Sequence, residues 1–290
     1  MRSHKGSTQL VYAEAGTLYV VGTPIGNLED MSVRAVKVLQ AVDLIAAEDT
    51  RHTGKLLQHF QIATPQISYH QHNSQQRIPE LVQRLQQGTA IALVSDAGMP
   101  GISDPGYELV RDCVAAKVPV VPIPGASAAI AALSASGLPT DRFVFEGFLP
   151  VKGQDRQARL QELKAEPRTM ILYEAPHRLR QTLADLAATL GEERQIAIAR
   201  ELTKRYETFW QGSLAAAISV YQTQDPKGEF TLVVAGTEIL PISLSESALK
   251  AALQDLFDQG ISRSEASRQL ASAIGLPRRQ VYQLALSMPD

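Results

Sequence analysis

Short apolar runs alternate with amphipathic segments along most of the chain. Each run has the length and composition of a buried strand. The predicted strands cover residues 18–21, 44–47, 90–94, 118–122, 143–149, 170–173, 196–202 and 230–235. Between them, apolar residues recur at helical spacing, as in Ile78, Leu81, Val82 and Leu85. This alternation predicts an α/β fold with two lobes and mostly parallel sheets.

The pattern changes after a linker at residues 239–245, because only helical periodicity follows. Segments 262–271 and 278–286 flank a turn that contains Gly275 and Pro277, which is typical of a helix-turn-helix. Arginines 278 and 279 begin the second of these helices, where such modules contact nucleic acid. A small helical cap with solvated arginines explains the same pattern equally well.

These changes divide the chain into four parts. We expect a flexible tail over residues 1–16, an N-terminal α/β lobe over 17–123, a C-terminal α/β lobe over 124–240 and a helical domain over 246–290. The length of 290 residues agrees with about two α/β units and a small extension.

The longest glycine-rich connection follows the strand that ends at Val94. It runs to Gly106, whereas an ordinary strand-to-helix connection needs about two to six residues. Ligands of open α/β sheets bind at the carboxyl ends of strands, so this loop is the first candidate for a binding site. We expect Asp104 to cap the next helix and Pro105 to occupy its first position.

Composition narrows the possible functions. The net charge of −2 means that nucleic acid has to be bound by local basic patches. The single cysteine, Cys113, excludes a disulfide within the chain and fits a reducing cytoplasm. No apolar run approaches the length of a membrane span, and we expect neither a membrane association nor a metal site.

Five segments that follow predicted strands are expected to meet in one site. They offer backbone groups, small side chains and single polar groups, which suit a compact ligand with an adenosine-like part. They cover residues 23–27, 48–53, 95–104, 125–128 and 173–178. The sequence contains neither a P-loop, nor a Gly-x-Gly-x-x-Gly after a strand, nor a Gly-x-Ser-x-Gly elbow.

The same segments, in the same order, resemble the 16S ribosomal RNA (cytidine-2′-O)-methyltransferase family of the tetrapyrrole methylase superfamily. The resemblance extends from about Thr17 to the C-terminus. It rests on GTPIGNL at 22–28, AEDTR at 47–51, SDAGMPGISDPG at 95–106, PGASA at 124–128 and YEAPHR at 173–178. It implies S-adenosylmethionine (SAM) in a cleft between two α/β lobes, 16S RNA in the small ribosomal subunit as the methyl acceptor, and a cytoplasmic homodimer.

The resemblance also implies the residues that contact SAM. The chain departs from the superfamily's Gly-Asp-Pro signature at positions 95–97, where the loop is also longer. The implied cofactor-binding residues are Pro24, Ser95, Asp96, Ala97, Gly98, Ile102, Ser127, Ala128, Tyr173 and Leu202.

Transfer to a ribose hydroxyl benefits from a group that accepts its proton. Glu48 is the first candidate and Asp49 the second, because both follow a strand that ends at the expected cleft; pairing with Arg51 is the alternative role for either one. The candidates for RNA binding are Arg51, His177, Arg178 and Lys204.

Two other functions remain open from the sequence. One keeps SAM but changes the acceptor to a tetrapyrrole or a protein side chain. The other is a nucleic-acid-binding regulator whose α/β lobes only sense SAM. Methyl transfer onto RNA separates the enzyme from the sensor.

Overall fold

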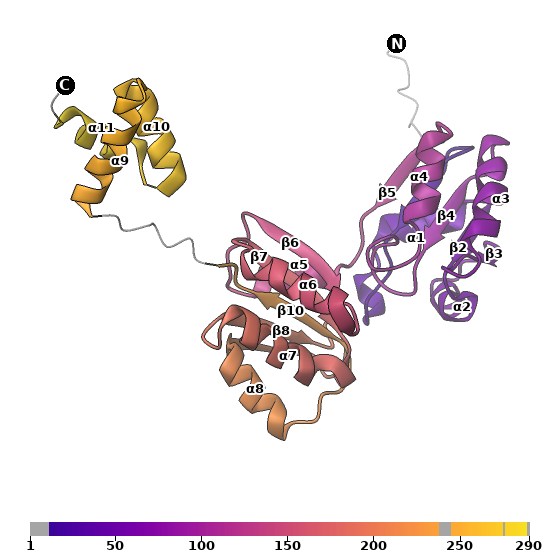
Figure 1. Ribbon diagram of the computed structural model, residues 1–290. Coiled ribbons are helices and arrows are strands. Elements are labelled where there is room, and N and C mark those ends of the chain that lie inside the picture. Colours follow the sequence, from indigo (N-terminus) through magenta and orange to yellow (C-terminus); the bar gives the residue numbers. More distant parts are fainter. Residues whose placement is uncertain (1–11, 238–244, 275, 289–290) are drawn as a thin grey trace, which may run out of the picture. The chain divides into compact units, whose positions relative to one another are not determined.

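A computed structural model describes residues 12–237, 245–274 and 276–288, with the elements labelled in Figure 1. Most of the expected tail (1–16) and of the linker (239–245) lies outside these residues. The chain forms two compact units that divide between residues 235 and 236. The helices of the described ranges are all too short or too polar to cross a lipid bilayer.

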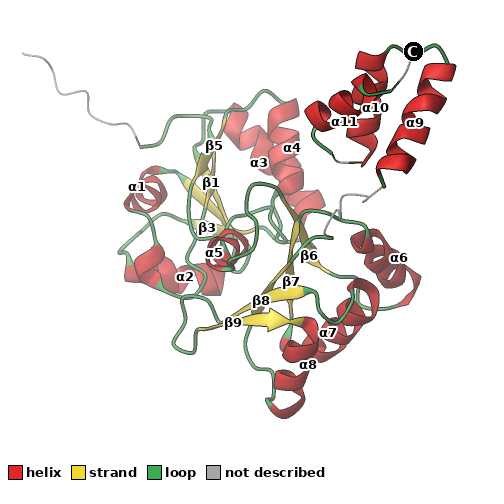
Figure 2. Ribbon diagram, turned by 90° about the vertical axis from the view of Figure 1, so that its left-hand side faces the viewer, coloured by secondary structure: helices red, strands yellow, loops and turns green. Residues whose placement is uncertain are grey.

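The first sheet is entirely parallel, in the order β3-β2-β4-β1-β5. Its strands are β1 (Leu18–Val21), β2 (Leu44–Ala47), β3 (Gln66–Ser68), β4 (Ile91–Val94) and β5 (Val120–Ile123). Alternate strand residues face opposite sides of the sheet. Helices α1 (Val33–Ala41) and α2 (Thr50–His59) cover one side, and α3 (Ser74–Gln86) and α4 (Tyr107–Ala115) cover the other (Figure 2).

The parallel arrangement explains why the loops of this lobe are important. All five strands end at one edge, so the loops after β1, β2, β4 and β5 are brought together there. A short 3₁₀ helix, Leu28–Asp30, lies in the first of these loops. Cys113 is fully buried on the inner face of α4, as the sequence predicted, and burial raises the pKa of its thiol to about 11.

The second sheet corrects the expectation of mostly parallel sheets. Its order is β6-β7-β10-β8-β9, and only the β6–β7 pair is parallel. The strands are β6 (Phe143–Phe148), β7 (Thr169–Glu174), β8 (Gln195–Arg200), β9 (Thr208–Ser213) and β10 (Phe230–Val234). The antiparallel pairs arise because β9 folds directly back on β8, and β10 returns after a helix to lie between β7 and β8.

Helices cover both sides of this sheet unequally. Helices α6 (Gly153–Lys164), α7 (Pro176–Leu190) and α8 (Leu214–Thr223) pack on one side with leucine-rich faces. The alanine-rich helix α5 (Ala128–Ala135) packs alone on the other side. Its Ala129 and Ala132 allow the close approach to the sheet that the small side chains predicted.

The described residues of the second unit form three helices, α9 (Glu246–Asp258), α10 (Arg263–Ile274) and α11 (Arg278–Leu286). They share a small core that includes Leu253, Ala266 and Val281. The predicted pair of helices at 262–271 and 278–286 is present, whereas Gly275 in the connection lies outside the described residues.

A candidate methyl-donor cavity between the two lobes

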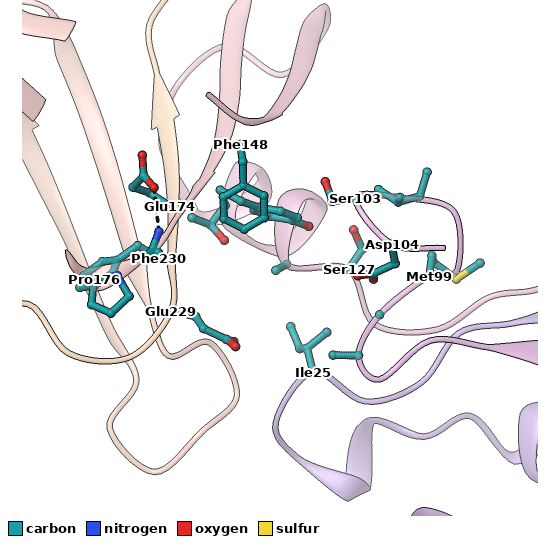
Figure 3. A pocket seen from close by; sticks show the side chains of 17 residues that line it. Ile25, Met99, Ser103, Asp104, Ser127, Phe148, Glu174, Pro176, Glu229 and Phe230 are labelled. Carbon is teal, nitrogen blue, oxygen red and sulfur yellow. Dashed lines mark hydrogen bonds between the residues drawn. The ribbon is translucent and has the colours of Figure 1, made fainter. Parts of the chain in front are cut away.

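A cavity of about 350 Å³ lies between the two α/β lobes (Figure 3). Loops that follow strands of the first sheet form one wall. The other walls come from the start of α5, the carboxyl ends of β6 and β7, and the start of β10. The residues that line this interlobe cavity are Ile25, 97–99, 102–104, Ser127, Ala128, Phe148, 173–176 and 229–231.

Backbone hydrogen bonds hold the loops of the first wall together. The Thr23 N–H donates to Gly98 O at 2.9 Å, and the Gly98 N–H donates back to Thr23 O at 3.1 Å. Gly98 has φ +75°, a conformation that favours glycine. Thr23 Oγ1 also donates to Ser95 O at 3.2 Å, so the loop after β1 supports the loop after β4.

The loops after β1 and β5 approach each other through two glycines. A Cβ added to Gly22 would lie 2.7 Å from the Cα of Gly125, and a Cβ on Gly125 would lie equally close to Gly22. Real Cβ atoms do not come this close to backbone, so both positions need glycine for the loops to meet.

The lining of the interlobe cavity fits SAM. Ile102 and Phe148 remain about half exposed although they are large and apolar, which offers apolar surface to an adenine ring. The ring of Phe148 stacks edge-on against Tyr173 at 5.7 Å, which fixes this surface. Asp104 supplies a carboxylate that suits the positive sulfonium and ammonium groups of SAM.

The carboxyl side chains of Glu48, Asp96 and Asp104 lie close to one another near the ends of β2 and β4. Glu48 Oε2 accepts a hydrogen bond from the Asp96 N–H at 3.2 Å, and Asp96 Oδ1 accepts one from the Asp49 N–H at 3.1 Å. Burial is the main cause that raises the pKa of Asp104 to about 6, and the charges of Glu48 and Asp96 add to it. Burial also raises the pKa of Glu48. Asp104 is therefore able to exchange a proton near neutral pH.

Asp49 has a different environment from Glu48. Its Oδ1 accepts the Arg51 N–H at 2.8 Å as the N-cap of α2, and its carboxylate makes two further bonds to the Arg51 guanidinium, at 3.1 and 2.6 Å. These bonds hold the pKa of Asp49 well below its usual range. Asp49 is therefore a weak base, and it does not line the interlobe cavity.

The structure places six of the ten implied SAM contacts in the lining of the interlobe cavity: Ala97, Gly98, Ile102, Ser127, Ala128 and Tyr173. Pro24, Ser95 and Asp96 instead line a neighbouring hollow of about 240 Å³. Leu202 follows β8 and packs beside the core under α5. These four residues are not among those that line the interlobe cavity.

The four candidate RNA-binding residues differ in exposure and in their partners. Arg178 is largely buried, where its Nε lies 3.2 Å from Glu174 Oε1 and its Nη2 donates to Leu149 O at 2.6 Å. Lys204 pairs with Glu201 and Glu229. Arg51 is exposed but paired with Asp49, and His177 is exposed at the start of α7. Arg178 is thus held inside the protein by its contacts with Glu174 and Leu149, whereas His177 faces solvent.

Sequence reasoning missed several residues of the cavity. Asp104 was expected to cap a helix, but α4 begins only at Tyr107 after Gly106, which has φ +148°. The signal for Asp104 was its place in the long glycine-rich loop. Phe148 and Thr231 belong to strands and carried no signal in the sequence, because a strand residue at a cavity has the same pattern as one in the core.

A second, larger cavity of about 510 Å³ adjoins the first lobe, and we call it the side cavity. It shares Ser103 and Asp104 with the interlobe cavity. Its lining comprises Glu48, 70–72, Ser74, Gly101, 103–105, Tyr107 and Glu108. No group of three His, Cys, Asp or Glu residues in the described ranges is arranged to hold a metal ion.

Comparison with known proteins first defines the class. The profile of the tetrapyrrole (corrin/porphyrin) methylases matches residues 17–218, and the chain belongs to this family. The fold is similar to that of the uroporphyrin-III C-methyltransferase of Thermus thermophilus, with a TM-score of 0.55 at 20% identity over 76% of this chain and 94% of that one. Diphthine synthase is similar at a TM-score of 0.59 and 14% identity, over 76% and 89% of the two chains.

Full-length relatives narrow the class to one group. The chain is 62% identical to the ribosomal RNA small subunit methyltransferase I of a Synechocystis strain, over 94% of this chain and 98% of the relative. It is 49% identical to the protein of the same name from Escherichia coli O157:H7, over 93% and 95% of the two chains. The chain is thus a methyltransferase that uses SAM as methyl donor, of the ribosomal RNA small subunit methyltransferase I group.

Proposed function

We propose that this enzyme transfers the methyl group of SAM to the ribose 2′-hydroxyl of a cytidine in 16S ribosomal RNA. The observation that carries this proposal is the identity of 62% over nearly the whole of both chains to a ribosomal RNA small subunit methyltransferase I. The cavity between the lobes supports it, because its largely apolar lining and the carboxylate of Asp104 suit SAM.

The interlobe cavity is the proposed SAM site. When bound, SAM supplies an activated methyl group on a positively charged sulfur. The small residues Ala97, Gly98 and Ala128 leave room for the ligand, and Tyr173 and Phe148 hold its apolar part. Fixing donor and acceptor in line provides most of the acceleration in such a displacement.

The RNA is proposed to reach the cavity as part of the small ribosomal subunit, in the cytoplasm. His177 and Arg51, which are both exposed, are the candidates for contacts to its phosphates. We also propose a homodimer. Phe143 and Phe145 on the edge strand β6 are more than one-third exposed, and such aromatic surface favours a protein contact.

Methyl transfer to isolated subunits tests the function directly. The enzyme is incubated with labelled SAM and small subunits that lack the modification, and the RNA is digested to nucleosides. We expect label in 2′-O-methylcytidine. Label in another nucleoside contradicts the acceptor, and SAM binding without any label favours a sensor.

A further inference from the structure

We infer that the side cavity receives the acceptor nucleoside, and that Asp104, on the wall common to both cavities, accepts the proton of the ribose hydroxyl. This inference rests on the proposed function and names the part of the molecule that positions the acceptor. It adds a site on the first lobe that lies outside the SAM cavity.

The side cavity and the interlobe cavity have a wall in common. Ser103 and Asp104 line both the interlobe cavity and the side cavity. The methyl donor and the acceptor oxygen have to meet, so two ligands in adjoining cavities meet at the residues that border both. In Figure 3, Ser103 and Asp104 lie on the first-lobe side of the interlobe cavity, beside Met99.

The side chains that line the side cavity suit a nucleoside. Tyr107 is 64% exposed, which leaves its ring available to stack on a base. His70 also lines this cavity, and an imidazole can offer a hydrogen-bond donor or acceptor to a base or a ribose. The carboxylates of Glu48 and Glu108 are acceptors, which match the exocyclic amine of cytosine and ribose hydroxyls.

The size of the side cavity agrees with this assignment. At about 510 Å³ it falls within the range of cavities that hold small organic ligands, and a nucleoside is of that kind. Its lining is acidic and contains neither lysine nor arginine, so it suits the ribose and the base rather than the phosphates.

Asp104 is better placed than Glu48 to accept the proton. Glu48 lines the side cavity alone, and its Oε2 already accepts the Asp96 N–H. Asp104 borders both cavities, and the titratable groups that act on its charge are Glu48, Asp96 and Tyr173. A base whose pKa lies near the working pH accepts and releases a proton most effectively.

The proposed step balances as a displacement. The 2′-oxygen forms a bond to the methyl carbon, and the bond from that carbon to sulfur breaks with its electron pair on sulfur. The hydroxyl proton passes to the Asp104 carboxylate. The products are a methyl ether, S-adenosylhomocysteine and a protonated Asp104, which later releases its proton to water.

A matched pair of variants tests the acceptor site. Tyr107→Ala removes the ring in the side cavity, and Tyr206→Ala is the control, because Tyr206 is also 64% exposed and also lies against an arginine but does not line either cavity. KM for unmethylated small subunits and kcat are measured with labelled SAM, and the Kd of SAM by calorimetry. We expect Tyr107→Ala to raise KM about tenfold, with kcat and the SAM Kd unchanged.

The outcomes separate the two proposals. A wild-type enzyme that labels no 2′-O-methylcytidine overturns the function and the acceptor site together. A wild-type enzyme that does so, with the same KM in Tyr107→Ala and Tyr206→Ala, overturns the acceptor site alone. A weaker Kd for SAM in Tyr107→Ala also overturns it, because the ring would then belong to the donor site.

A pH profile tests Asp104. We expect kcat/KM of the wild type, which reports the free enzyme, to rise as the pH passes through about 6, and Asp104→Asn to lower kcat at least about 100-fold and to remove this limb. Glu48→Gln should retain the limb but move it to lower pH, because the charge of Glu48 contributes to the raised pKa of Asp104. An Asp104→Asn enzyme with kcat within about threefold of the wild type excludes Asp104 as the proton acceptor.

Discussion

Asp104 illustrates how one residue can oppose stability while serving a site. Its pKa is raised from a usual value of 3.8 to about 6, so the folded protein binds its proton more tightly than the unfolded chain does. Stability then falls as the pH rises from about 4 to about 6, and the loss is complete above that range. Water reaches the half-buried carboxyl, which leaves an effect of about 1–2 kcal/mol.

The Asp104→Asn variant measures this effect on stability. The amide does not ionise, so we expect the variant to unfold at a higher urea concentration than the wild type at pH 8 and at the same concentration at pH 4. Urea titrations at both pH values check this expectation. Equal urea midpoints of the two proteins at pH 8 would mean that folding does not raise the pKa of Asp104.

Arg178 shows that a basic residue near a strand end need not face RNA. Its partner Glu174 is fully buried, accepts the Thr182 hydroxyl at 2.5 Å and accepts the Ala175 N–H at 2.8 Å. We expect Arg178→Ala to cost about 3 kcal/mol of unfolding free energy, because it leaves a buried charge without its cation. Arg180→Ala is the control: its ion pair with Asp225 is more than half exposed and its other bonds go to the carbonyls of Tyr221 and Gln224, so no buried charge loses its partner and the cost should be about 1 kcal/mol or less.

Denaturant titration of both variants distinguishes the two roles of Arg178. Equal and small losses of stability, together with a higher KM for small subunits in Arg178→Ala alone, would favour an RNA contact instead.

At the scale of elements, hydrophobic patterning predicted the central strands and the edge strands β5 and β6, but it missed the edge strands β3 and β9. Strands such as β1 and β2 are buried along their whole length, so their apolar runs were visible in the sequence. Strand β9 lies at an edge, and its side chains are mostly exposed or half-buried, so it has no such run. Helix α2 was missed because a polar first half and Gly54 hide its short buried face.

The site was predicted to the extent that it consists of loops at strand ends. The glycine-rich segments from 95–104 and 125–128 do reach the interlobe cavity. The contributions of Phe148 and of residues 229–231 could not be found in the same way, because they depend on how the second lobe folds against the first. Strand order is a tertiary property, and it also decides that β10 is antiparallel to both of its neighbours.

The contact of the loops after β1 and β5 gives a prediction at this scale. Gly22→Ala puts a Cβ 2.7 Å from the backbone of Gly125, so one loop has to move. We expect the variant to weaken SAM binding at least about tenfold by calorimetry, because a displacement of either loop distorts the cavity wall. Gly54→Ala in α2 is the control, since the nearest atom there belongs to the flexible Gln66 side chain; unchanged SAM binding in both variants contradicts the expectation.

At the scale of the whole molecule, the chain consists of a tetrapyrrole methylase fold and a separate helical unit. The α/β unit contains all residues of both cavities, and the solved structures that resemble the chain cover about three-quarters of it. The helical unit has its own core of residues such as Leu249, Leu270 and Ala285. We therefore expect donor binding and chemistry to belong to the first unit, which leaves the second available for another task.

Removal of the helical unit tests this division of labour. A chain that ends at residue 237 keeps every residue of the interlobe cavity, so we expect the same Kd for SAM and a cooperative unfolding transition. If α11 contributes to RNA binding through Arg278 and Arg279, as the helix-turn-helix pattern suggests, KM for small subunits should rise several-fold, by about 1 kcal/mol per lost contact, while kcat stays the same.

The matched control is the full chain with both arginines replaced by glutamine. An unchanged KM in the control with a raised KM in the truncated chain would assign the RNA contact to other residues of the unit, and loss of SAM binding on truncation would make the helices part of the catalytic fold.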